Sequence, residues 1–298
     1  MFKNLFQKNR IEKEYGKGLI FGNKREYNEA IQCFDKALEI DSNRVDILTA
    51  KALALSALEK FDEAFEYCDK ALELDLKYSD AWYVRGNIFW YLEKYEEALR
   101  AYDKALELEV NDGTVWSTKG NVLYELKRYK EALGCYKKAL ELNPQDFDTW
   151  YNKCNSLIKL ELYDEALNCY NNVLELNPQD SYFWNGKGFV LYQLERFDEA
   201  LECLNKSLKL NPDFLESWGI KGNVLNELER DEEALDCFEK VLNVNPNDEN
   251  GWYKKGHTLM KLKRNKEALE CFDEALKIDP NFEPALKDKK EILEDKIE

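Results

Sequence analysis

The sequence contains little of what most enzymes and membrane proteins use. Its 298 residues include one histidine, six prolines and 13 glycines. No stretch approaches the roughly 18 consecutive apolar residues typical of a membrane helix, and residues 1–10 lack an apolar run of signal-peptide length. No C-x-x-C pair and no G-x-x-x-x-G-K phosphate loop occurs. We therefore expect a cytoplasmic protein of helices joined by tight turns, with no membrane association, metal or cofactor.

Positive charge is also in short supply. The chain has 43 Lys and Arg against 59 Asp and Glu, a formal net charge of -16. Because an acidic surface repels phosphate, nucleic acids and anionic membranes are poor candidate partners. The chain is too apolar for a disordered protein, at 44% hydrophobic residues, and too charged for a membrane protein. Its length favours two domains or a repeat array over one core.

What the chain does contain is a repeat with a constant period. Alanine recurs every 34 residues from Ala30 to Ala268, and glutamate precedes it each time, without any insertion. Self-similarity at this period predicts a solenoid. With that alanine at position 20, the eight repeats are 11–44, 45–78, 79–112, 113–146, 147–180, 181–214, 215–248 and 249–282.

Several other positions recur with the alanine. Position 4 is tryptophan from Trp82 to Trp252, position 8 is mostly glycine, position 11 is Phe or Leu, position 24 is mostly aromatic, and position 32 is proline in the last five repeats. Positions 4, 8 and 11 share one face of a helix. The pattern predicts that Trp and Phe or Leu fill the space between two helices, that Gly and Ala allow close approach, and that Pro ends the second helix.

The motif W-x-x-K-G-x-x-[FL], A-x-x-x-[FY], P resembles the tetratricopeptide repeat family over residues 11–282. The resemblance implies an all-α, right-handed superhelical solenoid of helix–turn–helix repeats. Residues 1–10 are then an N-terminal extension. Residues 283–298 are a polar capping helix, with Leu286 and Leu293 at positions 4 and 11 of a ninth half-repeat. Repeat 1 departs from the motif, because Glu14 replaces the tryptophan.

Cysteine and histidine do not form a reactive pattern. Six of the eight cysteines stand at position 23. Equivalent helices of neighbouring repeats should lie roughly 8–10 Å apart, whereas a disulfide needs Cα atoms within about 7 Å. We expect buried thiols in a reducing compartment, not metal or redox sites. His257 stands at position 9, where most other repeats have Asn, so we expect it to line a groove and not to catalyse.

Position 7 departs from the family pattern, which usually has leucine there. In this chain it is always basic: Lys17, Lys51, Arg85, Lys119, Lys153, Lys187, Lys221 and Lys255. The interpretation we favour is structural, with the stem buried and the charge balanced by the position 19 glutamates or by position 25 carboxylates such as Asp35, Asp69 and Asp103. The alternative is a basic stripe that binds an acidic partner.

The resemblance implies that positions 2, 5, 6, 9, 12 and 13 face a concave groove. These positions carry large aromatic and amide side chains that the helix pair itself does not need. Tyr and Trp are common in binding hot spots, and an Asn amide can both donate to and accept from a peptide backbone. The alternative is that they only pack against neighbouring repeats. The candidate peptide-binding residues are Tyr83, Asn87, Trp90, Asn121, Tyr124, Tyr151, Asn152, Asn155, Tyr192, Asn223, Tyr253 and His257.

Some family members grip the C-terminal carboxylate of chaperones. Asn121 followed by Asn152 matches two parts of that clamp, but Ser117, Tyr182 and Gly186 stand where basic or other clamp residues are required. The groove charges lean acidic, so we expect a neutral to mildly basic protein or peptide partner. The predicted function is a non-catalytic protein-interaction scaffold. The alternative is a self-assembling component of a homo- or hetero-oligomeric complex, and the sequence leaves the oligomeric state open.

Overall fold

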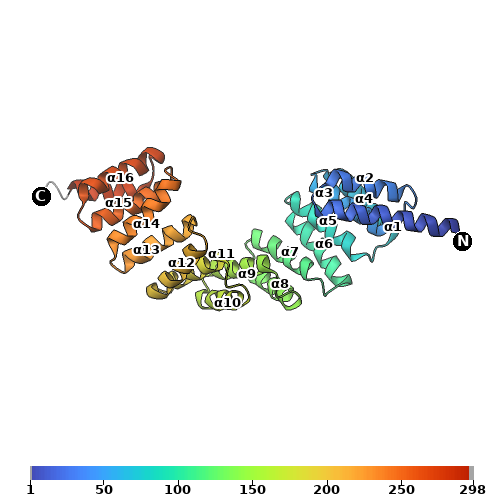
Figure 1. Cartoon of the computed structure of the whole chain (residues 1–298), viewed down its shortest axis with the longest axis horizontal. Helices are drawn as coiled ribbons and strands as arrows, with labels where there is room; N and C mark the ends of the chain where they lie inside the picture. The colour runs from blue at the N-terminus through green and yellow to red at the C-terminus, as the bar shows by residue number, and fades with distance from the viewer. Residues whose placement is uncertain (1, 295–298) are drawn as a thin grey trace. The chain divides into compact units, whose positions relative to one another are not determined.

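The computed structural model describes residues 2–294, and this part of the chain consists of 17 α-helices without any strand (Figure 1). The helices are α1 (Phe2–Asn23), α2 (Tyr27–Leu38), α3 (Val45–Ala57), α4 (Phe61–Leu74), α5 (Ser79–Tyr91), α6 (Tyr95–Leu108), α7 (Gly113–Glu125), α8 (Tyr129–Leu142), α9 (Phe147–Lys159), α10 (Tyr163–Leu176), α11 (Ser181–Gln193), α12 (Phe197–Leu210), α13 (Leu215–Glu227), α14 (Asp231–Val244), α15 (Glu249–Lys261), α16 (Asn265–Ile278) and α17 (Glu283–Glu294).

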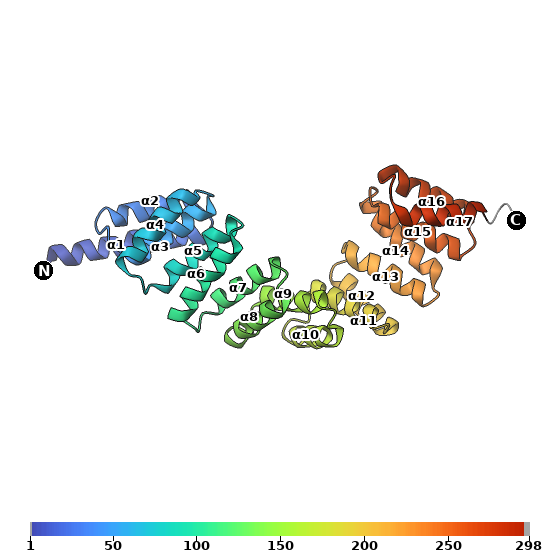
Figure 2. The ribbon, with the colours of Figure 1, turned by 180° about the vertical axis from the view of Figure 1, so that it is seen from behind.

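The chain divides into two compact units, Met1–Ser156 and Leu157–Glu298. In the first unit, α1 to α8 form four antiparallel pairs, and the second helix of each pair packs on the first helix of the next. The second unit repeats this arrangement from α11 to α16 and ends with α17, which packs on α16 (Figure 2). Each unit is thus a stack of helix pairs, and the predicted all-α repeat fold is confirmed.

The first helices of neighbouring repeats also touch each other. Helix α3 contacts α5 in the first unit, and α11 contacts α13 in the second. Within the described part of each unit taken by itself, no pair of second helices makes contacts of similar extent. Because helices converge on the inner side of a curved stack, the first helices line the inner face of each unit.

The turn inside each repeat uses the same hydrogen bonds. In repeat 3, the amide of Glu93 donates to the carbonyl of Trp90, and that of Lys94 donates to the carbonyl of Phe89. This Schellman motif places the position 15 residue in the left-handed region, where φ is 57° for Glu93. All eight repeats have a positive φ at this position, and none has glycine there.

Position 8 lets the two helices approach each other. A Cβ built on Gly120 would lie 2.5 Å from the ring of Tyr136, and one on Gly86 would lie 2.4 Å from the ring of Tyr102. The aromatic side chain at position 24 therefore occupies the space of the missing side chain. This confirms the close approach that the glycine pattern predicts.

The tryptophan at position 4 has a further role that the pattern did not predict. The indole nitrogen of Trp116 donates to the carbonyl of Val110 at 2.8 Å, and that of Trp252 donates to the carbonyl of Pro246 at 3.0 Å. In both cases the acceptor lies in the loop just before the helix. The tryptophan thus has a role beyond the predicted filling of space between two helices, because its indole N–H also ties the ring to the connection between repeats.

Helix α17 buries one face against the preceding pair. Ala285, Asp288 and Ile292 are buried, whereas Leu286 and Leu293 are 46% and 45% exposed. A following helix would normally cover the positions that these two leucines occupy. Residues 295–298 of the predicted cap lie outside the described residues. At the other end, α1 begins at Phe2 and continues without a break into repeat 1. No helix in residues 2–294 is long and apolar enough to cross a membrane.

Candidate protein-binding site

Amide side chains on the inner face of the first unit are tied into hydrogen bonds. The hydroxyl of Tyr102 donates to Asn87 Oδ1 at 2.8 Å, and that of Tyr136 donates to Asn121 Oδ1 at 3.0 Å. Asn152 Nδ2 also donates to Asn121 Oδ1, at 2.9 Å. The carbonyl oxygens of Asn87 and Asn121 are thus occupied within the fold, and the bond from Asn152 to Asn121 joins neighbouring first helices.

The aromatic candidates of the first unit differ in how far they reach solvent. Tyr83, Trp90 and Tyr124 are half-buried, and Tyr124 packs edge-on against Tyr129 at 5.2 Å between ring centroids. Tyr151 is 45% exposed. Burial raises the pKa of Tyr124, with a smaller contribution from nearby carboxyl and phenol groups that include Tyr151. Tyr124 on α7 and Tyr151 on α9 stand on helices that the hydrogen bond from Asn152 to Asn121 joins. Asn155 is half-buried.

In the second unit, Tyr192 and Asn223 lie on two neighbouring first helices. Tyr192 is half-buried and packs against Phe197. Asn223 is half-buried, and it has no hydrogen-bond partner among the described residues. The reason is visible in the sequence, because position 24 of its repeat is Phe238, which has no hydroxyl group to donate.

His257 and Tyr253 connect repeat 8 to α17. The Nδ1 atom of His257 lies 2.9 Å from Asp288 Oδ2, and the Tyr253 ring packs against Phe272 and Phe282. Burial raises the pKa of Tyr253, and the charge of Asp288 raises it further. These contacts attach α17 to the stack, so both candidates have a structural role.

Two exposed tyrosines were not among the candidates. Tyr91 on α5 is 62% exposed, and Tyr182 on α11 is 57% exposed. They occupy positions 13 and 2, which belong to the predicted groove positions. Their positions in the repeat could therefore have identified them from the sequence. They differ from the half-buried aromatic candidates in being largely exposed to solvent.

Carboxylates crowd the inner face at the start of the first unit. Arg44 makes a fork of two bonds to Asp46, at 2.9 and 2.7 Å, and a third bond to Glu12 at 2.9 Å. Burial alone would raise the pKa of Asp46, but the bonds and charge of Arg44 outweigh burial and lower it. Arg44 also lies over the ring of Tyr15. The acidic groups here are thus partly neutralised by one guanidinium group.

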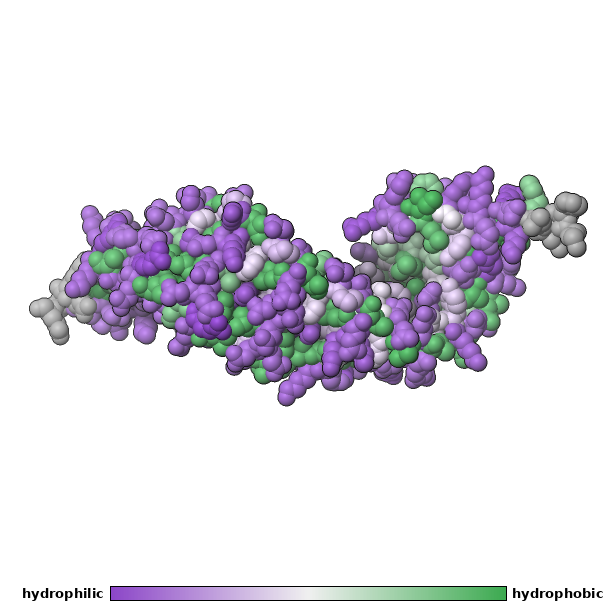
Figure 3. Space-filling view, turned by 60° about the horizontal axis from the view of Figure 1, so that its bottom comes forward, coloured by the Kyte–Doolittle hydropathy of each residue, from purple (hydrophilic) through white to green (hydrophobic). Residues whose placement is uncertain are grey.

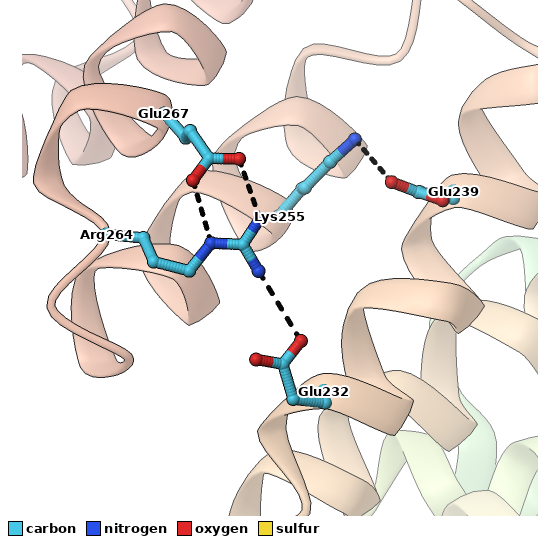
Figure 4. A network of polar contacts seen from close by, with 5 residues as sticks. All are labelled: Glu232, Glu239, Lys255, Arg264 and Glu267. Atoms are coloured by element: carbon cyan, nitrogen blue, oxygen red, sulfur yellow. Dashed lines mark hydrogen bonds and ion pairs between the residues drawn. The ribbon is translucent and has the colours of Figure 1, made fainter.

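The basic residue at position 7 pairs with the carboxylate at position 25 of the preceding repeat. Lys51 pairs with Asp35, Arg85 with Asp69, and Lys119 with Asp103. These are the three carboxylates that the sequence argument named, so the balanced arrangement is confirmed for them. The pairing recurs between Lys255 Nζ and Glu239 Oε1 at 2.9 Å (Figure 4), and between Lys289 and Asp273.

The pairing is not universal, because position 25 is not acidic in repeats 4, 5 and 6. Lys137 stands there in repeat 4, and Asn171 and Asn205 stand there in the next two. Burial lowers the pKa of Lys153, and the charge of Lys137 lowers it further. Its ammonium group lies 4.7 Å from the ring centroid of Trp150. For these repeats the position 25 part of the prediction was wrong. Its position 19 part agrees with the charges of Lys187 and Lys221, which help to lower the pKa of Glu199 and Glu233.

Most cysteines behave as predicted. Cys33, Cys68, Cys135, Cys203, Cys237 and Cys271 are free and buried. Burial raises the pKa of the Cys135, Cys237 and Cys271 thiols to about 11. No group of three or more His, Cys, Asp or Glu side chains in residues 2–294 is arranged to hold a metal ion.

Two cysteines contradict the prediction, because Cys154 and Cys169 are disulfide-bonded. The sequence argument considered only equivalent helices of neighbouring repeats. Positions 8 and 23 of one repeat are much closer, since a Cβ built on Gly256 would lie 3.1 Å from the Cβ of Cys271. The repeat geometry therefore permits contacts that the inter-repeat distance excludes.

Solved structures with similar folds include several repeat proteins. YrrB, described as a TPR protein with an unusual peptide-binding site, is 29% identical; the match covers 64% of this chain and 99% of that chain, with a TM-score of 0.54. The Cut9–Hcn1 assembly of the APC/C is 18% identical, covering 90% and 52%, with a TM-score of 0.59. MamA from Desulfovibrio magneticus RS-1 is 23% identical, covering 57% and 96%, with a TM-score of 0.53.

No curated protein matches the sequence. Two tetratricopeptide repeat profiles, by contrast, together match it eight times without a sizeable gap. The matched residues are 12–44, 45–78, 79–112, 114–146, 147–180, 181–214, 215–248 and 250–282. These segments reproduce the eight repeats found by internal alignment, and together with the helix-pair architecture they show that the chain belongs to the tetratricopeptide repeat family.

Proposed function

We propose that this protein is a non-catalytic scaffold that binds a peptide or protein segment on the inner face of its first helices. The observation that carries the proposal is the pair of aromatic side chains Tyr124 and Tyr151 on two helices joined by the Asn152–Asn121 hydrogen bond, with Tyr151 45% exposed. Neither ring is part of the repeat motif. Exposed aromatic residues beside a polar surface are the usual anchors of protein interfaces.

The amide groups beside these rings support the proposal. The Oδ1 atoms of Asn87 and Asn121 are occupied, whereas their Nδ2 groups have no acceptor in the described part of the chain. A peptide carbonyl could accept from them without disturbing the helix pairs. The carboxylates Asp46 and Asp80 on the same face of this unit favour a neutral to mildly basic segment. The peptide-binding description of the similar protein YrrB agrees with this kind of ligand.

A double substitution tests the proposal. Partners are first captured from the native cell with the wild-type chain and identified, and the affinity of the purified partner is then measured by calorimetry. We expect Tyr124→Ala with Tyr151→Ala to weaken binding about tenfold or more, as the loss of a hot spot does.

The matched control removes a similarly exposed apolar side chain from a second helix. Leu142 at the end of α8 is 42% exposed, and Leu142→Ala should leave the affinity unchanged. All variants should remain folded. Leu142→Ala should melt close to the wild type, and the double variant at a lower temperature because Tyr124 is half-buried against the core. Equal affinities of the double variant and the wild type for the partner would reject the inner face of this unit as the binding site.

A further inference from the structure

Two successive repeats of the second unit leave the position 7 lysine without a carboxylate at position 25 of the preceding repeat. In repeat 8 of the same unit, Lys255 binds Glu239 at 2.9 Å (Figure 4). The equivalent partners of Lys187 and Lys221 are Asn171 and Asn205, which carry no charge. Neither lysine forms an ion pair within residues 2–294, although the chain has a net charge of -16.

Both lysines lie against a tryptophan whose position is fixed. The ammonium groups of Lys187 and Lys206 lie 5.5 and 4.4 Å from the ring centroid of Trp184. The indole nitrogen of Trp184 donates to the carbonyl of Pro178 at 2.9 Å. One repeat further along, Lys221 lies 5.1 Å from the ring centroid of Trp218. The cations are therefore held on half-buried rings and do not extend freely into solvent.

The nearby position 19 glutamates compensate these charges only in part. The hydrogen bond from an arginine lowers the pKa of Glu199 and Glu233 most, and the charges of Lys187 and Lys221 lower it further. Each glutamate forms its ion pair with the arginine and not with the lysine. Glu199 is engaged by Arg196 at 2.7 Å, and Glu202 forms no ion pair with Lys187 or Lys206. In repeat 3, Lys104 is paired with Glu107 three residues later. Three residues after Lys206 the chain has Lys209. Helix α12 therefore carries a positive charge at the position where α6 carries the negative charge of Glu107.

The equivalent surface of repeat 3 is hollow. There, a cavity of about 470 Å³ is lined by Trp82, Arg85, Phe89, Ala101 and Asp103, among others. Trp184, Lys187, Cys203 and Asn205 occupy the corresponding positions of repeat 6. In repeat 3 the aspartates Asp69 and Asp103 balance this surface, and in repeat 6 both are replaced by asparagine. Polar side chains cover most of the molecular face drawn in Figure 3, with smaller apolar patches between them.

We propose that Trp184, Lys187 and Lys206, together with Trp218 and Lys221, bind an acidic segment of a partner protein. Its carboxylates would pair with Lys187 and Lys221, as the carboxylates at position 25 do with the position 7 residue in the paired repeats. Neighbouring repeats are about 10 Å apart, and an extended chain advances about 3.3 Å per residue. The segment therefore carries an acidic residue at about every third position. A nucleic acid is the poorer fit, because the surrounding surface of an acidic protein repels a long polyanion.

This surface involves positions 4, 7 and 26 and not the inner-face positions, so it is independent of the function proposed above. The test measures binding of a fluorescently labelled peptide with glutamate at every third position, by anisotropy, at low ionic strength. A peptide with glutamine in place of glutamate is the ligand control. We expect Lys187→Ala with Lys221→Ala to weaken binding of the glutamate peptide about tenfold.

A second variant supplies the missing charges and leaves both lysines in place. Asn171→Asp with Asn205→Asp restores the arrangement of the paired repeats, and it should also weaken peptide binding about tenfold without lowering the melting temperature. Lys255→Ala, which removes an already paired lysine, should leave the affinity unchanged. The proposal is overturned if the wild type does not prefer the glutamate peptide over the glutamine peptide. It is equally overturned if the aspartate variant binds as tightly as the wild type, or if single-stranded DNA binds more tightly through the same lysines.

Discussion

At the scale of single residues, the shape of the repeat depends on how positions 8 and 24 fit together. In five of the six repeats with a large ring at position 24, as in Tyr136, position 8 is glycine; repeat 5 instead has Tyr170 with Cys154. Repeat 2 has Ala52 at position 8, and its position 24 is the small Cys68. The glycine therefore provides clearance and not backbone freedom, because none of the glycines has a positive φ.

A matched pair of glycine substitutions tests this interpretation. Gly120→Ala places a Cβ 2.5 Å from the ring of Tyr136, and we expect overpacking to lower the free energy of unfolding by roughly 1–3 kcal/mol. Gly134→Ala on the exposed face of α8 meets nothing within 4 Å, and it should raise stability by up to about 1 kcal/mol. Urea unfolding followed by circular dichroism measures both. The clearance argument fails if the two variants shift stability in the same direction.

The residues that form the core could be predicted because they recur eight times. The contacts of individual candidate site residues could not be predicted in the same way. Asn87 and Asn121 look free in the sequence, but whether a tyrosine or a phenylalanine stands at position 24 decides whether the amide is occupied. That decision depends on a residue 15 positions away on the opposite helix, and a pattern read along one helix face does not include it.

At the scale of the element, each first helix ends in a left-handed residue. These residues are Arg25, Glu59, Glu93, Lys127, Glu161, Glu195, Glu229 and Lys263, with φ between 56° and 63°. A residue with a Cβ pays roughly 1–2 kcal/mol to adopt this conformation. All eight are Arg, Lys or Glu and none is glycine. The eight tight turns therefore form despite the low glycine content of the sequence.

Glycine at these sites is expected to stabilise the protein. Glu93→Gly and Glu229→Gly remove the Cβ strain, and the larger entropy of glycine in the unfolded chain offsets only part of that gain. We expect each to raise the free energy of unfolding by about 0.5–1 kcal/mol. Glu97→Gly, inside the exposed part of α6, is the control and should lower stability by about 1 kcal/mol. Thermal unfolding of the three variants gives the comparison, and destabilisation by Glu93→Gly would contradict the strain argument.

The bounds of the helices follow from local chemistry that the sequence displays. The prolines at position 32 come two residues after the second helix ends, as Leu142 and Pro144 illustrate. The sequence pattern did not predict that α1 would begin as early as Phe2. Its first turns lie before the repeat begins, where no recurring residue marks a helix.

At the scale of the molecule, each repeat contacts mainly its neighbours. In such a stack the stability of a repeat depends on its own helices and on the two adjoining interfaces. The effect of damage to one end should therefore decline with distance along the chain. Helix α17 suits a test of this expectation, because a buried side chain and an exposed one are consecutive in its sequence and can be compared directly.

Ile292 is 1% exposed and the next residue, Leu293, is 45% exposed. Ile292→Ala should cost roughly 2–4 kcal/mol of local stability through the cavity it leaves. Hydrogen exchange should then accelerate in α15, α16 and α17 and stay unchanged in α3 to α6. Leu293→Ala should have little effect. Uniform acceleration along the whole chain would show that the molecule unfolds as one cooperative unit.

The fold of the whole chain was predictable because period, helix faces and helix ends all indicate the same repeat. The candidate surfaces were less predictable, because they depend on exceptions to the pattern. Asn171 and Asn205 are unremarkable polar residues in isolation. They gain meaning only when the structure shows that the carboxylates they replace would bind Lys187 and Lys221.

The tryptophan that fixes each inter-repeat connection has a practical consequence. Six of the seven tryptophans stand at position 4, and each indole nitrogen donates to a loop carbonyl from Trp82 to Trp252. The emission of an indole shifts when its surroundings become aqueous. A set of variants that each keep one of these rings would therefore report melting repeat by repeat, so the chain carries its own array of optical probes along its length.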